Sequence, residues 1–457
     1  MSCLLNKKFT SFVKKLSIIE IVLIQICLFY CFCYGDIFIT TNHGIVLLDC
    51  LYEGKIGSFY DVGIAVVNGQ KYKAYYDFFI YIIFAIWNLP LWLAKKSGLI
   101  DDPLNYLLGI MWAKTIVLFF CVICLYYMWK VLSLKERYSK YNLVLVFSTD
   151  ILITAFICII GQYDIIVLSF MMAGLYYYLS GRKKMFIFAF AIAMSIKLFA
   201  LLLFCPLLLQ KEKNFLKIIL NIMIVLIPIF IFRLLVPMGQ SNSSLLIGLF
   251  LDNSFSANNG KISICIAAYI FFLLYCYIHN FKDQLYSSIV TPVFVFVIFF
   301  LLGNPLPYWW VYVSPFIVLI ILLNKNSNVI LQLVSIVGEL MLYLYLMRIY
   351  YWVFSPYNIM NGVLRNVISV KGNYTSGPVN MYSAFFSRTS INQDSMLEIL
   401  CSLAFICICS FIVLCQNKRV VSNKLINIRS NVIFVWSLRL ISIVIAYFLM
   451  FFQLKYI

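Results

Sequence analysis

Apolar residues recur along the chain in runs of about 16 to 22, each separated from the next by a short polar stretch. Lipid offers the backbone no hydrogen-bond partner, so runs of this length must be helical. The alternation typical of a membrane β-barrel is not seen. The pattern predicts an all-α, polytopic integral membrane protein with about eleven full spans. We place them at residues 17–35, 107–129, 142–160, 165–180, 217–236, 263–279, 287–302, 308–323, 329–347, 396–415 and 432–453.

A further apolar segment, Asp77–Ala94, is long enough to cross a membrane. A crossing there would put the basic stretch Lys130–Lys140 outside, against the positive-inside rule. Trp87, Pro90 and Trp92 suit a helix that lies at the membrane surface. We therefore predict an interfacial helix within one large outer loop, residues 36–106.

The segment Met185–Leu209 has basic sequence at both ends, "GRKK" before it and "KEKNFLK" after it. A single crossing would leave one basic cluster outside, whereas a helical hairpin keeps both in the cytoplasm. The tip of the hairpin would carry Lys197. Paired segments that stop inside the membrane recur where membrane proteins bind polar ligands.

Composition and charge support this interpretation. The chain is 64% hydrophobic and 11% charged, and its net charge of +18 is dispersed between the spans, which favours a topological role over nucleic-acid binding. Lys7, Lys8, Lys14 and Lys15 precede the first apolar run, which predicts a cytoplasmic N-terminus and a retained first span in the cell membrane. We expect a catalytic module over residues 1–323, followed by C-terminal spans over 324–457 with an outer loop at 348–395.

Polar groups placed next to apolar runs are the candidate site. Asp36 follows the first span directly, where partial desolvation raises the pKa of a carboxylate and makes it a better base. Gln162 and Asp164 lie in the turn "GQYD" between two spans, where helix capping by Asp164 is the alternative role. Lys197 is an intramembrane cation suited to a phosphate, with a structural pairing as the alternative.

Four further residues are weaker candidates for substrate binding. His43 and Asp49 belong to the first outer loop, with an ordinary solvated loop as the alternative. Lys114 lies inside the second span, with snorkelling to the membrane surface as the alternative. Tyr308 is a candidate only through the resemblance described in the next paragraph. Glu339, near the middle of a span, needs a polar partner, and structural pairing is favoured there over catalysis. The chain shows no P-loop, no dinucleotide fingerprint and no DxD motif.

In this order the pieces resemble the polytopic class C glycosyltransferases, in particular the polyprenyl-phosphate-sugar-dependent families related to the mannosyltransferases. Asp36 matches the acidic residue of their first outer loop, and Gly161, Gln162 and Asp164 match a "WGQxD" turn. "YYDFFIYIIF" corresponds loosely to an interfacial "YPPLYYLL" segment without its prolines. "GNPLPYWWVYVSP" echoes an "HPxYxxWxxP" turn, with Asn304 in place of histidine. The resemblance covers about residues 36–315.

The resemblance implies transfer of a sugar from a polyprenyl-phosphate donor to a cell-envelope glycan or glycolipid acceptor on the extracytoplasmic face. Asp36 would be the base, Lys197 the phosphate ligand, and Gln162 and Asp164 would line the site. A divalent metal is a candidate cofactor, because carboxylates and water suit one. Two alternatives stay open. One is a lipid-linked oligosaccharide transporter, and the other is a polysaccharide polymerase that uses Arg348, Arg365 and Arg388 of the long outer loop.

Overall fold

The computed structural model describes most of the chain and is 81% helical. Among the described residues, six helices are long and apolar enough to cross a membrane, or up to eight if each of two bent helix pairs is one span. The coarse prediction of a nearly all-α, multi-pass protein is confirmed. The N-terminal lysines and Asn304 lie outside the described residues. The residues that the structure describes are 18–67, 70–135, 138–237, 254–257, 260–303, 305–324, 328–368, 370, 375–387, 392–416 and 428–456.

Several predicted spans correspond to apolar helices shorter than a full crossing. They are Ile18–Cys31, Asp164–Leu179, Ile264–Ile278 and Pro307–Leu323, and Leu198–Lys211 of the predicted hairpin is similarly short. A helix rises only about 1.5 Å per residue, so such helices do not by themselves reach across the hydrocarbon core. Within the described residues, length and composition therefore support six to eight spans, and the predicted number of eleven is not confirmed.

The chain divides into two compact units. The first comprises residues 1–34, 135–161 and 317–457, and the second comprises residues 35–134 and 162–316. The predicted boundary at residue 323 lies close to one of these divisions. The sequence pattern did not indicate that the first span and residues 135–161 group with the C-terminal spans, because that grouping depends on contacts between distant segments.

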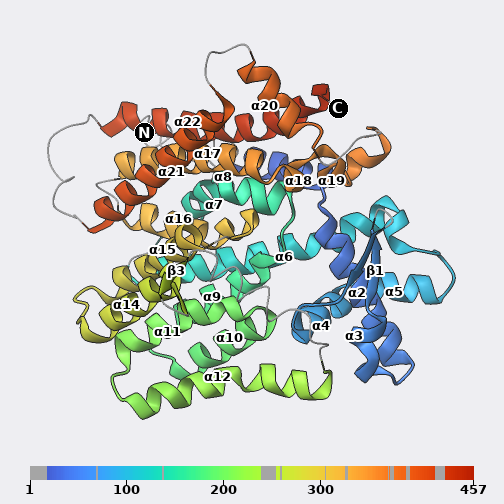
Figure 1. Ribbon diagram of the computed structural model, residues 1–457, viewed down its shortest axis with the longest axis horizontal. Helices are drawn as coiled ribbons and strands as arrows, with labels where there is room; N and C mark the ends of the chain where they lie inside the picture. The colour runs from blue at the N-terminus through green and yellow to red at the C-terminus, as the bar shows by residue number, and fades with distance from the viewer. Residues whose placement is uncertain are drawn as a thin grey trace, which may run out of the picture. The chain divides into compact units, whose positions relative to one another are not determined.

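The helices of the second unit that carry the candidate residues pack face to face. α9 (Asp164–Leu179) contacts both α6 (Leu107–Leu132) and α10 (Lys183–Ile196), and α10 also contacts α12 (Phe215–Leu235) (Figure 1). Gly174 allows α9 and α10 to approach, because a Cβ there would lie 2.4 Å from the ring of Phe190. α9 and α10 are thereby packed closely in the second half of α9.

The segment predicted as a large outer loop is folded. α2 (Gly35–Tyr52) packs on α4 (Phe78–Trp87), and at Gly44 a Cβ would lie 2.9 Å from the backbone of Ala85. The helical pattern of α2 is hidden in the sequence because its buried face includes Thr40, Thr41 and His43 beside apolar residues. The other elements are η1 (Ile56–Ser58), α3 (Phe59–Val62), the antiparallel strands β1 (Ile64–Val67) and β2 (Gln70–Lys73), and η2 (Pro103–Asn105).

The predicted interfacial helix is two helices and not one. α4 and α5 (Leu89–Lys96) meet at an angle of 64°. The bend lies at Asn88, and Pro90 follows as the second residue of α5, where its missing N–H is tolerated. Asp77, just before α4, forms an ion pair of 2.8 Å with Arg233 near the end of α12.

The segment around Lys197 turns back on itself as the predicted hairpin does. α10 ends at Ile196, Lys197 has an extended backbone, and η4 (Leu198–Ala200) leads into α11 (Leu201–Lys211). The two open ends meet, because Lys183 Nζ lies 3.3 Å from a carboxylate oxygen of Glu212. Phe186 and Phe204 stack between the legs with ring centroids 5.0 Å apart.

Because the two ends of the hairpin meet, we predict that both face water on the same side of the membrane. Lys183→Cys and Lys213→Cys, each at an exposed position, should react with a membrane-impermeant maleimide from the same side of oriented vesicles. The wild-type chain sets the background from its own thiols. Labelling of the two positions from opposite sides would show that the segment crosses the membrane.

The remaining elements of the second unit follow the hairpin. They include β3 and β4, which pair antiparallel, and α14, which packs on α11. α16 spans the division between the two units. The bounds are β3 (Ser254–Ala257), β4 (Gly260–Ser263), α14 (Ile264–Ile278), α15 (Gln284–Leu302), η5 (Pro307–Tyr312) and α16 (Ser314–Leu323).

The first unit centres on α17 (Asn328–Ile349), which packs against α21 (Gln393–Gln416) and α22 (Ile428–Phe452). Gly338 of α17 lies against Cys407 of α21, where a Cβ would come within 2.8 Å of the cysteine side chain. The unit also contains the helix Ile18–Cys31. Its shorter elements are α7 (Lys140–Ser148), α8 (Ile151–Ile153), the π-helix η3 (Thr154–Ile159), α18 (Tyr351–Phe354), α19 (Pro356–Ile359), η6 (Val363–Asn366), α20 (Pro378–Phe386) and η7 (Gln453–Tyr456).

Candidate active site

The "GQYD" turn brings two polar side chains to the start of α9. Gly161 has φ of +77°, a left-handed conformation that favours glycine. Asp164 is the first residue of α9, and the capping position is taken by Tyr163. The side chain of Asp164 therefore does not serve as the N-cap, which was the alternative role considered for it, and it contacts other elements.

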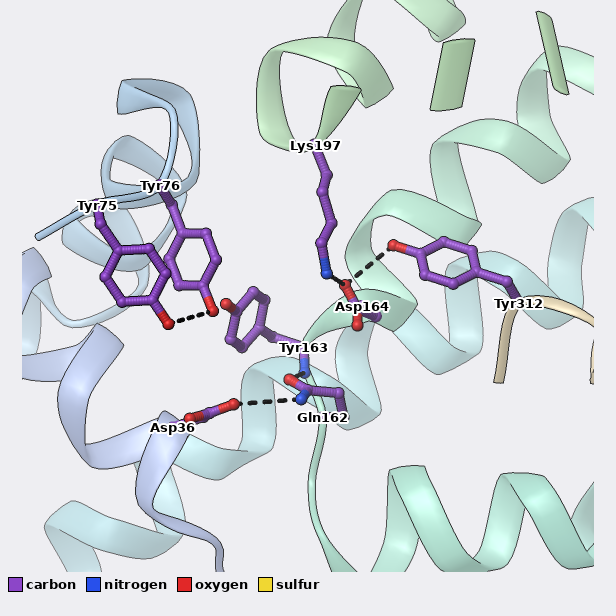
Figure 2. A network of polar contacts seen from close by, with 8 residues as sticks. All are labelled: Asp36, Tyr75, Tyr76, Gln162, Tyr163, Asp164, Lys197 and Tyr312. Atoms are coloured by element: carbon purple, nitrogen blue, oxygen red, sulfur yellow. Dashed lines mark hydrogen bonds and ion pairs between the residues drawn. The ribbon is translucent and has the colours of Figure 1, made fainter. Parts of the chain in front are cut away.

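Asp164 pairs with the predicted phosphate ligand. Lys197 Nζ lies 2.6 Å from Asp164 Oδ1, and the hydroxyl of Tyr312 donates to the same oxygen at 2.9 Å (Figure 2). The side chain of Asp164 is 1% exposed and that of Lys197 is 13% exposed. The break between α10 and η4 positions Lys197, while η5 supplies Tyr312. Lys197 and Tyr312 thus meet at one carboxylate, although they lie 33 and 148 positions from Asp164 in the sequence.

Asp36 meets the other polar residue of the turn. Gln162 Nε2 donates to Asp36 Oδ2 at 3.2 Å, and Gln162 Oε1 accepts from the backbone N–H of Tyr163 at 3.0 Å (Figure 2). Gln162 is buried, so its orientation is fixed by these two bonds. Asp36 lies in the first turn of α2. The four residues favoured by sequence, Asp36, Gln162, Asp164 and Lys197, therefore converge on one place.

The electrostatic environment favours Asp36 as a base. Burial raises the pKa of Asp36 to about 6, with the negative charge of Asp164 acting in the same direction. The hydrogen bond from Gln162 and the charge of Lys197 act against the rise. Asp36 lies outside the candidate membrane spans. A carboxylate with this pKa is ionised at neutral pH and is a stronger base than an ordinary aspartate.

Three tyrosines form a wall beside Asp36 that sequence reasoning missed. The hydroxyls of Tyr75 and Tyr76 lie 2.9 Å apart, and the ring of Tyr76 meets that of Tyr163 edge to face at 5.7 Å (Figure 2). Burial raises the pKa of Tyr75 to about 12, and the charge of Asp36 adds to the rise. These phenols are therefore neutral, and the hydroxyl of Tyr75 donates to that of Tyr76. Their signals in the sequence were the tyrosine pair that precedes α4 and the tyrosine of the "GQYD" turn.

Aromatic rings also surround Lys197. Its ammonium lies 5.0 Å from the ring centroid of Trp309 and 6.0 Å from that of Tyr312, within the range of cation–π attraction. Trp309 is buried, and its indole N–H has no hydrogen-bond partner among the described residues. Asp164 Oδ2 is likewise buried and without such a partner in the described part of the chain. Buried polar groups are usually paired with protein, water or a ligand, so each of these two atoms has the capacity for one more hydrogen bond.

The structure gives the four weaker sequence candidates different surroundings. Asp49 is about 20 Å along α2 from Asp36, by the rise of a helix, and forms a 2.8 Å ion pair with Lys96. His43 is buried, and its Nε2 lies 3.0 Å from the carbonyl of Tyr72. Lys114 is buried within α6. Tyr308 is buried in η5, and its phenol contributes to raising the pKa of Tyr76 after burial and nearer phenols.

The acidic side chains at the site are those of Asp36 and Asp164. No group of three or more His, Cys, Asp or Glu side chains that could hold a metal ion occurs in the described part of the chain. The charge of Asp164 is already balanced by Lys197 at 2.6 Å. We derive no catalytic step through a metal.

Glu339 has the polar surroundings that the sequence required. The hydroxyl of Ser335 donates to it at 2.6 Å, and Arg439 and Asp150 are its charged neighbours in the first unit. Arg439 is 1% exposed and donates to Gln332 at 3.2 Å. Of the arginines considered for a polymerase, Arg348 ends α17 and Arg365 lies in η6, while Arg388 lies outside the described residues.

Comparisons with known proteins do not identify the chain. It matches no family model, no curated protein and no solved structure. Its function is therefore argued from the geometry and chemistry of the site.

Proposed function

We propose that the protein is an integral membrane glycosyltransferase. It transfers a sugar from a polyprenyl-phosphate donor to a hydroxyl of a cell-envelope glycan or glycolipid on the extracytoplasmic face. The observation that carries the proposal is the convergence of a raised-pKa carboxylate, Asp36, with an ammonium, Lys197, through adjoining residues of one turn. Transfer of a sugar from a phosphate needs a base and a cation.

The residues divide the chemistry between them. Asp36 accepts the proton of the acceptor hydroxyl while the acceptor oxygen bonds to the anomeric carbon. The bond from that carbon to the phosphate oxygen breaks, and the electron pair leaves with the lipid phosphate. Lys197 stabilises this departing charge. An ammonium has three N–H donors, so Lys197 can hold Asp164 and still donate to a phosphate.

Other groups at the site position Lys197 or are suited to contact the substrate. Asp164, anchored by Tyr312, holds Lys197 at the end of the hairpin and is a positioning residue. The buried Trp309 N–H is a donor suited to a second phosphate oxygen, and Asp164 Oδ2 is an acceptor suited to a sugar hydroxyl. Each of these two atoms would gain a hydrogen-bond partner when a phosphorylated sugar binds.

The pKa of Asp36 predicts the acid limb of the pH profile. Only the ionised carboxylate accepts a proton, so kcat/KM for transfer should fall about tenfold per pH unit below the pKa of about 6. The hydrogen bond from Gln162 lowers this pKa. Gln162→Met should therefore move the midpoint of the acid limb to higher pH, measured as kcat/KM with a polyprenyl-phosphate sugar.

Gln210→Met is the matched control for that measurement. Gln210 is also hydrogen-bonded, with Nε2 donating to Thr291 at 2.7 Å, but it lies at the open end of the hairpin. Its substitution should change stability and leave the midpoint where it is in the wild type. Equal midpoints in the wild type and in Gln162→Met would remove Asp36 as the titrating base.

The transporter remains the second candidate because of the first unit. Buried Glu339, Arg439 and Asp150 are charges of the kind found along intramembrane pathways. Purified protein in detergent separates the two functions, since it has no vesicle asymmetry. Consumption of a polyprenyl-phosphate sugar there supports transfer, whereas transport without consumption in vesicles supports the alternative.

A further inference from the structure

A cavity lies at the open end of the hairpin, at the opposite end of its legs from Lys197. Its volume is about 110 Å³, and its lining includes Lys183, Lys211, Gly181 and Tyr178. Pockets that enclose whole small ligands measure roughly 300 Å³ or more. The cavity therefore suits a single compact group, such as a headgroup, and not a nucleotide or a sugar chain.

The charge around the cavity is strongly positive. The two segments that meet there, "GRKK" and "KEKNFLK", hold six basic residues and one acidic residue. Glu212 is paired with Lys183. Lys211 has no carboxylate within ion-pair distance in the described part of the chain, and its ammonium donates to the carbonyl of Tyr178 at 2.6 Å. A carbonyl offers no formal negative charge, so an anion would complete the balance.

The helix at this end adds to the attraction for an anion. α10 begins at Lys183, and its N-cap, Arg182, makes no side-chain capping bond. The first-turn N–H groups of a helix point outward without intrahelical acceptors and carry partial positive charge. Gly181, with φ of +72°, precedes this turn, and a Cβ there would meet nothing within 4 Å, so the approach is open.

Apolar side chains flank the charged cavity. Met185 and Phe188 of α10 are 41% and 59% exposed, and Phe215 and Leu216 at the start of α12 are 69% and 76% exposed. A soluble anion would gain nothing from these side chains. Acyl chains beside a phosphate headgroup would cover them and remove their apolar area from water.

From this combination we propose that the open end of the hairpin binds the phosphate headgroup of an anionic phospholipid. Lys183 and Lys211 contact the headgroup, and the acyl chains lie along the exposed apolar faces of α10 and α12. One headgroup would touch both legs of the hairpin, which holds together the element that presents Lys197. The proposal does not depend on the reaction proposed above.

The test measures thermal unfolding of the full-length protein in detergent micelles and compares the effects of two lipids. Phosphatidylglycerol should raise the midpoint of thermal unfolding by a few degrees more than phosphatidylcholine does, because a ligand bound by the folded state stabilises it. In Lys183→Gln/Lys211→Gln this difference should fall by at least half. Lys71→Gln/Lys73→Gln on β2, with the same charge change at exposed positions, should keep the wild-type difference.

Three outcomes would overturn the proposal. One is an equal response of the wild type to both lipids, and another is an equal loss in the two double variants, which would indicate unspecific attraction. The third is a full response to inorganic phosphate or glycerol phosphate alone, which would indicate a soluble anion.

If the Lys183/Lys211 variant does not fold, native mass spectrometry of the wild type in mixed micelles decides. Retention of phosphatidylcholine and phosphatidylglycerol in the mixing ratio would refute the site.

Discussion

The variant Lys197→Met/Asp164→Asn should fold and insert like the wild type and lose sugar transfer by at least about 100-fold. The ion pair it replaces is buried, with Nζ and Oδ1 2.6 Å apart. Removing one partner alone would leave an uncompensated buried charge, at a cost of about 3 to 5 kcal/mol in stability. Removing both avoids that penalty and takes away the ammonium that the leaving phosphate needs, while the asparagine keeps an oxygen that can accept from Tyr312.

The matched control is Lys96→Met/Asp49→Asn. This pair has nearly the same geometry, 2.8 Å, and belongs to the same unit, but it is more exposed and lies away from Asp36. It should retain transfer within a few-fold, as expected of an exposed pair. Turnover is measured with purified protein and a polyprenyl-phosphate sugar. Full turnover by the Lys197/Asp164 variant would show that the pair is structural only.

Asp36→Asn should lower transfer by about 10²- to 10⁴-fold, the usual effect of removing a general base. Asn keeps an oxygen that can accept from Gln162, so the local hydrogen bond of 3.2 Å has a substitute. Donor binding should stay near the wild-type level, because Lys197 is untouched. Asp49→Asn in the same helix should transfer sugar normally.

The same variant should be more stable than the wild type above pH 6. The pKa of Asp36 is raised by folding, so its protonated form stabilises the fold, and that stabilisation is lost as the pH rises through about 6. Asn carries no charge and lacks this penalty. Thermal unfolding at pH 5 and pH 8 measures the stability difference between the variant and the wild type, which should be larger at pH 8. A variant that loses both activity and stability at pH 8 would have a structural aspartate at this position.

Sequence by itself determined the class of protein and the identity of the main polar residues. The length of an apolar run and the scarcity of charges within it are local properties, so the all-α, multi-pass character and the basic ends of the hairpin were predictable. The cost of burying charge marked Asp36, Asp164 and Lys197, because a carboxylate or ammonium beside apolar runs needs a reason to be there.

Only the tertiary structure decided which of these residues meet. Asp36 and Asp49 are similar in sequence context, yet α2 places them about 20 Å apart. Asp49 there forms an ion pair with Lys96. Gln162 reaches Asp36 across 126 positions, and Tyr312 reaches Asp164 across 148. α2 itself was hidden because threonine, histidine and glycine occupy much of its buried face. Such pairings depend on the packing of distant helices, which no local pattern along the chain encodes.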